Sequence, residues 1–153
     1  MKNSILVFAM ILLTIAINPY LTQNAHALVT SVTITGPDTS QSFGAAFTMR
    51  YTVAQGTGNT ATAGTITFTR TGGTADGATH TYTMTVPGDT STGAHTISRA
   101  TLETGFGNSL VDGTIYTIVV SVTDGSAFTD TATSVTADFT APTFTAAKTA
   151  SNQ

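Results

Sequence analysis

The stretch from Ala46 to Ala54, A-F-T-M-R-Y-T-V-A, decides the fold class. Large apolar side chains occupy every second position, and threonine and arginine lie between them. This two-residue period is that of an extended strand with one face buried and the other in water. Threonine is β-branched, so it favours strands while it keeps the outer face polar. The stretch therefore predicts a half-buried β-strand.

The same alternation recurs along the chain, whereas helical periodicity is nearly absent. Turns that contain glycine, proline and aspartate separate the alternating segments, and residues 103–108 are expected to form a loop. Every connection is short enough for antiparallel pairing, and no segment supplies the crossover helix of a parallel sheet. We predict an all-β sandwich of about seven antiparallel strands in two facing sheets, at residues 31–35, 46–54, 65–70, 79–86, 94–102, 114–122 and 128–139.

Residues 1–27 have the features of an export signal. Lys2 supplies a weak positive charge, Ile5 to Ile17 is almost entirely apolar, and Ala25-His26-Ala27 is a small-x-small cleavage site. The apolar run is shorter than the about 20 residues that a bilayer-spanning helix needs. We predict a signal peptide helix that is removed after Ala27; an uncleaved membrane anchor is the alternative.

The rest of the chain divides into two parts. Residues 28–140 are expected to form one sandwich domain, and residues 141–153 a linker, the start of a further repeat, or a free tail. The chain has no cysteine, so stability must come from the core without disulfides.

The composition of the chain argues against several kinds of partner. The 153 residues carry a net charge of −3, and charged residues make up only 8%. Nucleic acids and anionic membranes are bound by clustered basic residues. After removal of the leader the cations are few and scattered: Arg50, Arg70, Arg99 and Lys148. No second apolar run follows the leader, so we expect no stable membrane insertion of the mature chain.

Two motifs carry a resemblance to a known family. Leu110-Val111-Asp112-Gly113-Thr114-Ile115-Tyr116 resembles the L-x-P-G-T-x-Y stretch of fibronectin type III domains, with Leu110, Gly113, Thr114 and Tyr116 matching and Asp112 in place of the proline. Asp138-Phe139-Thr140-Ala141-Pro142-Thr143 is similar to a linker between tandem repeats.

The chain thus resembles the immunoglobulin-like, or fibronectin type III-like, repeats of prokaryotic secreted and cell-surface proteins. The resemblance implies that Tyr116 forms a tyrosine corner, in which its hydroxyl bonds to upstream backbone. It also implies a structural role for the four matching residues.

Candidate chemistry is sparse. His80 and His95 lie in predicted strands without an acid partner implied by spacing, and no nucleophile motif occurs, so we expect no enzyme and no cofactor. Calcium binds carboxylates and carbonyls, and the weak candidate ligands are Asp76 and Asp138. Among the aromatic residues, tyrosines alternate inward, and Phe106 is expected either to be exposed for binding or to plug one end of the sandwich.

The leading hypothesis is a non-catalytic structural or adhesion module that is secreted or held at the cell surface. Its partners would be neighbouring immunoglobulin-like domains or other surface proteins. One alternative is a self-assembling filament or surface-layer subunit in which residues 144–153 donate a strand to a neighbour. A second alternative is a carbohydrate-binding accessory module, whose partners would be glycans.

Overall fold

The computed structural model describes residues 29–56, 60–77 and 79–141. The predicted signal peptide, residues 1–27, lies outside the described residues, and so does the predicted C-terminal segment beyond residue 141. Both remain predictions.

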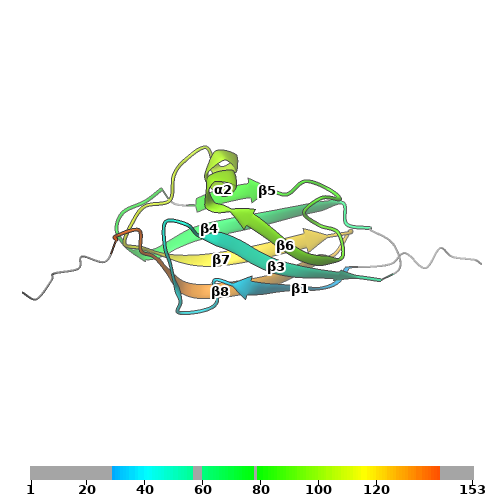
Figure 1. Ribbon diagram of the computed structural model, residues 1–153. Coiled ribbons are helices and arrows are strands. Elements are labelled where there is room, and N and C mark those ends of the chain that lie inside the picture. Colours follow the sequence, from blue (N-terminus) through cyan, green and yellow to red (C-terminus); the bar gives the residue numbers. More distant parts are fainter. Residues whose placement is uncertain (1–28, 57–59, 78, 142–153) are drawn as a thin grey trace, which may run out of the picture.

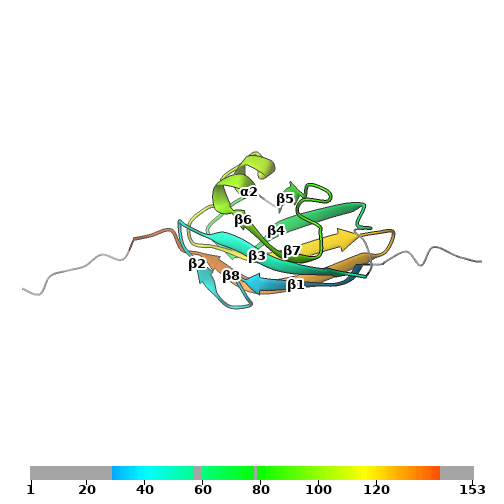
Figure 2. The ribbon, with the colours of Figure 1, turned by 45° about the vertical axis from the view of Figure 1, so that its right-hand side comes forward.

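The described chain is mostly β-structure in two sheets, which confirms the expected all-β sandwich at that level (Figures 1 and 2). Across the smaller sheet, from one edge to the other, lie β1 (Val29–Gly36), β3 (Thr48–Gln55) and β6 (Gly93–Ser98). Across the larger sheet, again from edge to edge, lie β2 (Ser42–Phe43), β8 (Ala127–Ala137), β7 (Thr114–Thr123), β4 (Ala63–Gly73) and β5 (Thr79–Thr83).

Alternation along the strands builds the core between the sheets. Every second residue of β7 is buried, from Thr114 to Val122, and the residues between them are half-buried because β7 is central in its sheet. In β3 the same period buries Met49, Tyr51 and Val53. The largest fully buried side chains come from strands of both sheets and from the one described helix: Tyr51, Tyr116, Phe68, Met49, Ile66, Leu102 and Ile118.

One pairing differs from the prediction of antiparallel strands alone. After β1 ends, the chain crosses to the larger sheet and forms the two-residue β2, which runs parallel to β8 and pairs Ser42 with Thr136 and Phe43 with Ala137. A strand of two residues has too little alternation to be visible as a sequence pattern. Its Phe43 side chain is nevertheless buried in the core.

The prediction of a strand over residues 94–102 is wrong after Ser98. The prediction of a loop over residues 103–108 is also wrong for most of its length, because this segment is mostly helical. Helix α2 (Arg99–Phe106) follows β6 directly. The Ser98 hydroxyl accepts a hydrogen bond from the Thr101 amide and caps the helix, and Gly107, at φ 72°, ends it in the left-handed region. Leu102 is fully buried, as expected of a core contact, but from a helix.

The strand predicted over residues 79–86 also ends early. Strand β5 stops at Thr83; Met84 is still buried, but Val86 is 41% exposed instead of facing the core. The reason is local, since the Asp89 carboxylate accepts a hydrogen bond from the Thr85 amide at 2.8 Å and turns the chain.

Two carboxylates close the open edge of β1 against the other sheet. The Val29 amide donates to Asp124 Oδ2 at 2.5 Å, and the Ile34 amide donates to Asp130 Oδ2 at 2.7 Å. Both acceptors lie at or beside β8, at the side of the sandwich where β1 and β8 are neighbours (Figure 1). The bonds satisfy edge amides that would otherwise be free to pair with another chain.

We predict that Asp130→Ala lowers the free energy of unfolding by about 1–3 kcal/mol, because it leaves the half-buried Ile34 amide without its acceptor. Urea unfolding followed by far-UV circular dichroism measures the change. Asp38→Ala is the control, because that carboxylate accepts from the Thr39 amide within an exposed turn. An equal loss in both variants would contradict a role for Asp130 in joining the sheets.

Candidate functional site

The turn that leads into β7 and the first residues of that strand hold the four motif residues, Leu110, Gly113, Thr114 and Tyr116. The Tyr116 ring is fully buried, and its hydroxyl oxygen accepts a hydrogen bond from the Val111 amide at 3.2 Å. Leu110 is buried beside the turn. Gly113 has φ 73°, a conformation that favours glycine, and the Thr114 hydroxyl donates to the Thr74 carbonyl at 3.1 Å. The four residues thus lie together at one corner of the larger sheet.

A buried polar cluster extends from this corner. Asp76 Oδ2 accepts a short hydrogen bond from the Tyr116 hydroxyl and lies 2.9 Å from His80 Nε2. The side chains of His80 and Asp76 are only 4% and 6% exposed. The Phe106 ring, 5.4 Å from the His80 ring, packs beside them. The expectation that His80 has no acid partner is therefore wrong.

The cluster contains an acid, an imidazole and a phenol, but their contacts are those of a structural network. Asp76 Oδ2 contacts both the Tyr116 hydroxyl and His80 Nε2, and Asp76 Oδ1 accepts a hydrogen bond from the Gly77 amide at 2.7 Å. No serine or cysteine side chain takes part in these contacts. The cluster holds the loop after β4 against the start of β7, and burial keeps solvent away from it.

The electrostatics of the cluster favour an ionised Asp76. Burial raises the pKa of the Asp76 carboxyl, but the hydrogen bonds from Tyr116, His80 and the Gly77 amide outweigh it, so the pKa lies below its usual value. Burial, followed by the hydrogen bond to Asp76, raises the pKa of Tyr116 to about 12. Tyr116 therefore stays a neutral donor to a charged acceptor, which is a strong kind of hydrogen bond.

The two candidate calcium ligands lie in different surroundings. The oxygens of Asp76 already accept the bonds described above, whereas Asp138 is exposed after the end of β8. Within residues 29–56, 60–77 and 79–141, no three histidine or acidic side chains come together as a metal site would require.

An open groove of about 430 Å³ lies between Tyr82 and helix α2, lined on the helix side by Ala100, Thr101, Thr104 and Gly105. Tyr82 is half-buried, and its hydroxyl donates to Asp89 Oδ2 at 3.1 Å. The groove therefore offers an aromatic ring and threonine hydroxyls, without a charged side chain in its lining. Such a surface can bind an uncharged ligand.

The other aromatic candidates are packing residues. Tyr51 is fully buried, and its hydroxyl donates to the Asp89 carbonyl at 2.8 Å. Phe106 is partly buried against the core, with its ring 5.5 Å from the Phe68 ring, so it is a packing residue and not an exposed binding residue.

Threonines dominate the outer face of the larger sheet. The strand registers place them side by side, and Val119 and Ser121 of β7 complete the rows. The two best-defined rows run Thr83–Thr65–Ser121–Thr129 and Thr81–Thr67–Val119–Thr131. These rows carry hydroxyl and methyl groups and no charge. They can therefore face water, and they exert no electrostatic attraction on nucleic acid.

Comparison of the chain with protein-family models, curated proteins and solved structures gives no match.

We predict that Tyr116→Phe lowers the free energy of unfolding by about 1–3 kcal/mol, because it leaves buried Asp76 with one donor fewer and the Val111 amide without its acceptor. Chemical denaturation measures the loss. Tyr82→Phe is the matched control; its hydroxyl also bonds to a carboxylate but the side chain is only half-buried, so the loss should be smaller. A change near zero for Tyr116→Phe would show that the corner does not stabilise the fold.

The lowered pKa of Asp76 predicts a pH dependence of stability. A carboxyl whose pKa is lower in the folded state stabilises the fold fully above its unfolded pKa, and this contribution is lost as the pH falls through the folded pKa. The difference in unfolding free energy between wild type and Asp76→Asn should therefore be largest at about pH 7 and shrink toward about pH 3. Urea titrations across this range test it, and a constant difference would contradict it.

Proposed function

We propose that the chain is a non-catalytic extracellular module of the immunoglobulin-like, fibronectin type III-like class, with a structural or adhesive role in a secreted or cell-surface protein. The strand order supports this class. With β1, β3 and β6 as strands A, B and E, and β4, β5, β7 and β8 as C, C′, F and G, the two sheets have the A-B-E and G-F-C-C′ neighbours of such sandwiches. The short β2 beside β8 corresponds to a strand that switches sheets.

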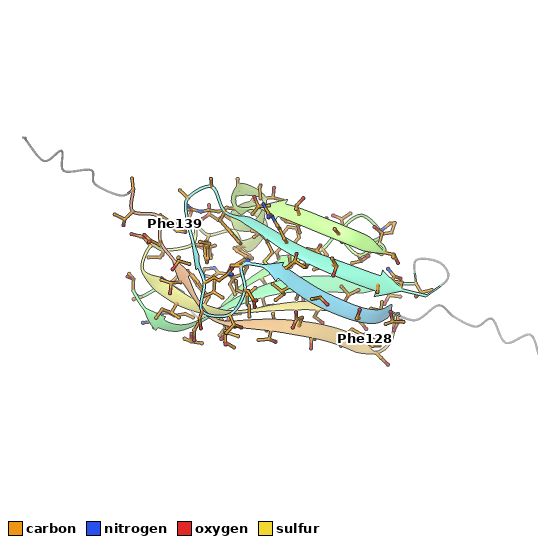
Figure 3. All side chains as sticks on the ribbon, turned by 60° about the horizontal axis from the view of Figure 1, so that its bottom comes forward. Phe128 and Phe139 are labelled. Carbon is orange, nitrogen blue, oxygen red and sulfur yellow. The ribbon has the colours of Figure 1, made fainter. Side chains whose placement is uncertain are left out.

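The placement of the two ends of the described chain supports a structural role. Strand β1 begins at one end of the elongated sandwich, and the described chain stops at the opposite end, close to Phe139 (Figures 1 and 3). Entry and exit at opposite ends would allow the module to be threaded into a row of modules or held away from a cell surface. Partners of this kind would be neighbouring domains or other surface proteins.

The placement of the polar groups in the described residues supports a structural role. The acid, imidazole and phenol groups that lie together are covered, and the open groove is lined by uncharged side chains. No described helix has the length and apolar character needed to span a membrane. Secretion itself rests on the leader-like sequence of residues 1–27.

One observation favours a second candidate, a carbohydrate-binding accessory module. The groove between Tyr82 and α2 presents part of an aromatic ring beside Thr101 and Thr104. Sugars bind to such combinations of a ring face and hydroxyl groups.

Expression of the full chain in a secreting prokaryotic host tests the proposal. We expect an exported product whose intact mass corresponds to residues 28–153, and we expect Ala27→Arg to remain uncleaved, because signal peptidase requires a small residue there. A cell-associated wild-type product of full length would contradict the extracellular assignment. Applied to a glycan array, the exported product separates the two candidates, because binding that Tyr82→Ala abolishes would favour the carbohydrate-binding module.

A further inference from the structure

The polypeptide remains attached to the domain after its last strand ends. The Ala137 carbonyl, at the end of β8, accepts from the Gly113 amide at 2.8 Å. The next residue, Asp138, donates its amide to the Phe43 carbonyl at 2.9 Å. The chain is therefore bonded on one side to the turn before β7 and on the other side to β2.

Asp112 continues this attachment for two more residues. Its Oδ1 accepts from the Phe139 amide at 2.5 Å, and its Oδ2 accepts from the Thr140 hydroxyl at 2.8 Å. The hydrogen bond from the Phe139 amide, followed by that from the Thr140 hydroxyl, holds the pKa of Asp112 below its usual value. The side chain is therefore a carboxylate at neutral pH. Asp112 stands where the fibronectin motif has proline, which has no side-chain acceptor.

The side chain of Phe139 is held independently of its backbone. The Arg99 guanidinium lies 3.7 Å from the centre of the Phe139 ring, and the Phe43 ring lies 5.8 Å from it. Arg99 is itself fixed by Glu103, with Nε and Oε1 2.7 Å apart, and the same Oε1 accepts from the Leu110 amide at 2.9 Å. Helix α2 thus presents a positioned cation to the aromatic ring.

We propose that Asp112, Arg99 and Glu103 form an exit clamp that fixes the direction in which the polypeptide leaves the sandwich. Asp112 binds the Phe139 amide and the Thr140 hydroxyl. Arg99, positioned by Glu103, contacts the Phe139 ring, which also packs against Phe43 of the core. Residues 138–140 are then a rigid continuation of β8. The clamp does not depend on secretion or on a row of modules, but it would set the angle of any segment that follows.

Amide hydrogen exchange and ¹⁵N relaxation of the full chain test the clamp. In the wild type, residues 138–140 should show heteronuclear NOE values equal to those of β8. Asp112→Ala should speed exchange of the Phe139 amide by about tenfold or more, because a bond to a charged acceptor is lost. Arg99→Gln should lower the NOE of Phe139 and Thr140.

Asp124→Ala is the matched control, because Asp124 accepts from the Val29 amide, at the start of β1. It should leave exchange at Phe139 unchanged. Thr140→Val removes a single donor with little change of shape, so it gives a milder test if Asp112→Ala fails to fold, and it should lower the NOE of residue 140. The clamp would be overturned by wild-type NOE values that fall directly after Ala137, or by unchanged dynamics of residues 138–140 in a folded Asp112 variant.

Discussion

The contacts of Tyr116 join the parts of this protein that are far apart in sequence. Its ring lies among the aromatic residues of the core, 5.7 Å from Phe68 and 6.4 Å from Phe43. Its hydroxyl connects the turn before β7 to Asp76 in the loop after β4. One side chain thus combines apolar burial with the polar bonds that fix two loops, and the end of the sandwich where the chain exits is built around that corner.

A second principle of the structure is the use of carboxylates as acceptors for backbone amides. Charged residues make up only 8% of the chain, and several acidic ones accept hydrogen bonds from backbone amides, Glu103 in addition to its ion pair with Arg99. Asp124 and Asp130 bind amides of β1, Asp89 binds Thr85, and Glu103 binds Leu110. Such bonds are stronger than neutral ones, which helps a domain without disulfides.

The sequence predicted the parts of the fold that depend on local alternation. Strands β3 and β7 were recognisable because their period continues over eight residues or more. Helix α2 was missed because its single buried side chain, Leu102, makes no helical stripe, although Ser98 and the four-residue spacing of Arg99 and Glu103 were available as signals.

The polar network was largely invisible in the sequence for a different reason. Asp76 and His80 are four residues apart and could have been paired, but Tyr116 joins them from a distance of 40 residues. The contact of Arg99 with Phe139 and that of Asp112 with Thr140 likewise connect distant segments. Contacts of this kind follow from the strand order, which a single sequence does not specify.

The start of β1 and the end of β8 lie at opposite ends of the sandwich, and this has a mechanical consequence. Tension applied between them acts along the strands, because β1 and β8 both run along the long axis of the sandwich (Figure 1). The hydrogen bonds of β1 with β3, and those of β8 with its neighbours, are then sheared together instead of being unzipped one at a time. A load on this molecule is therefore shared across whole strands, and resistance to stretching is built into its topology.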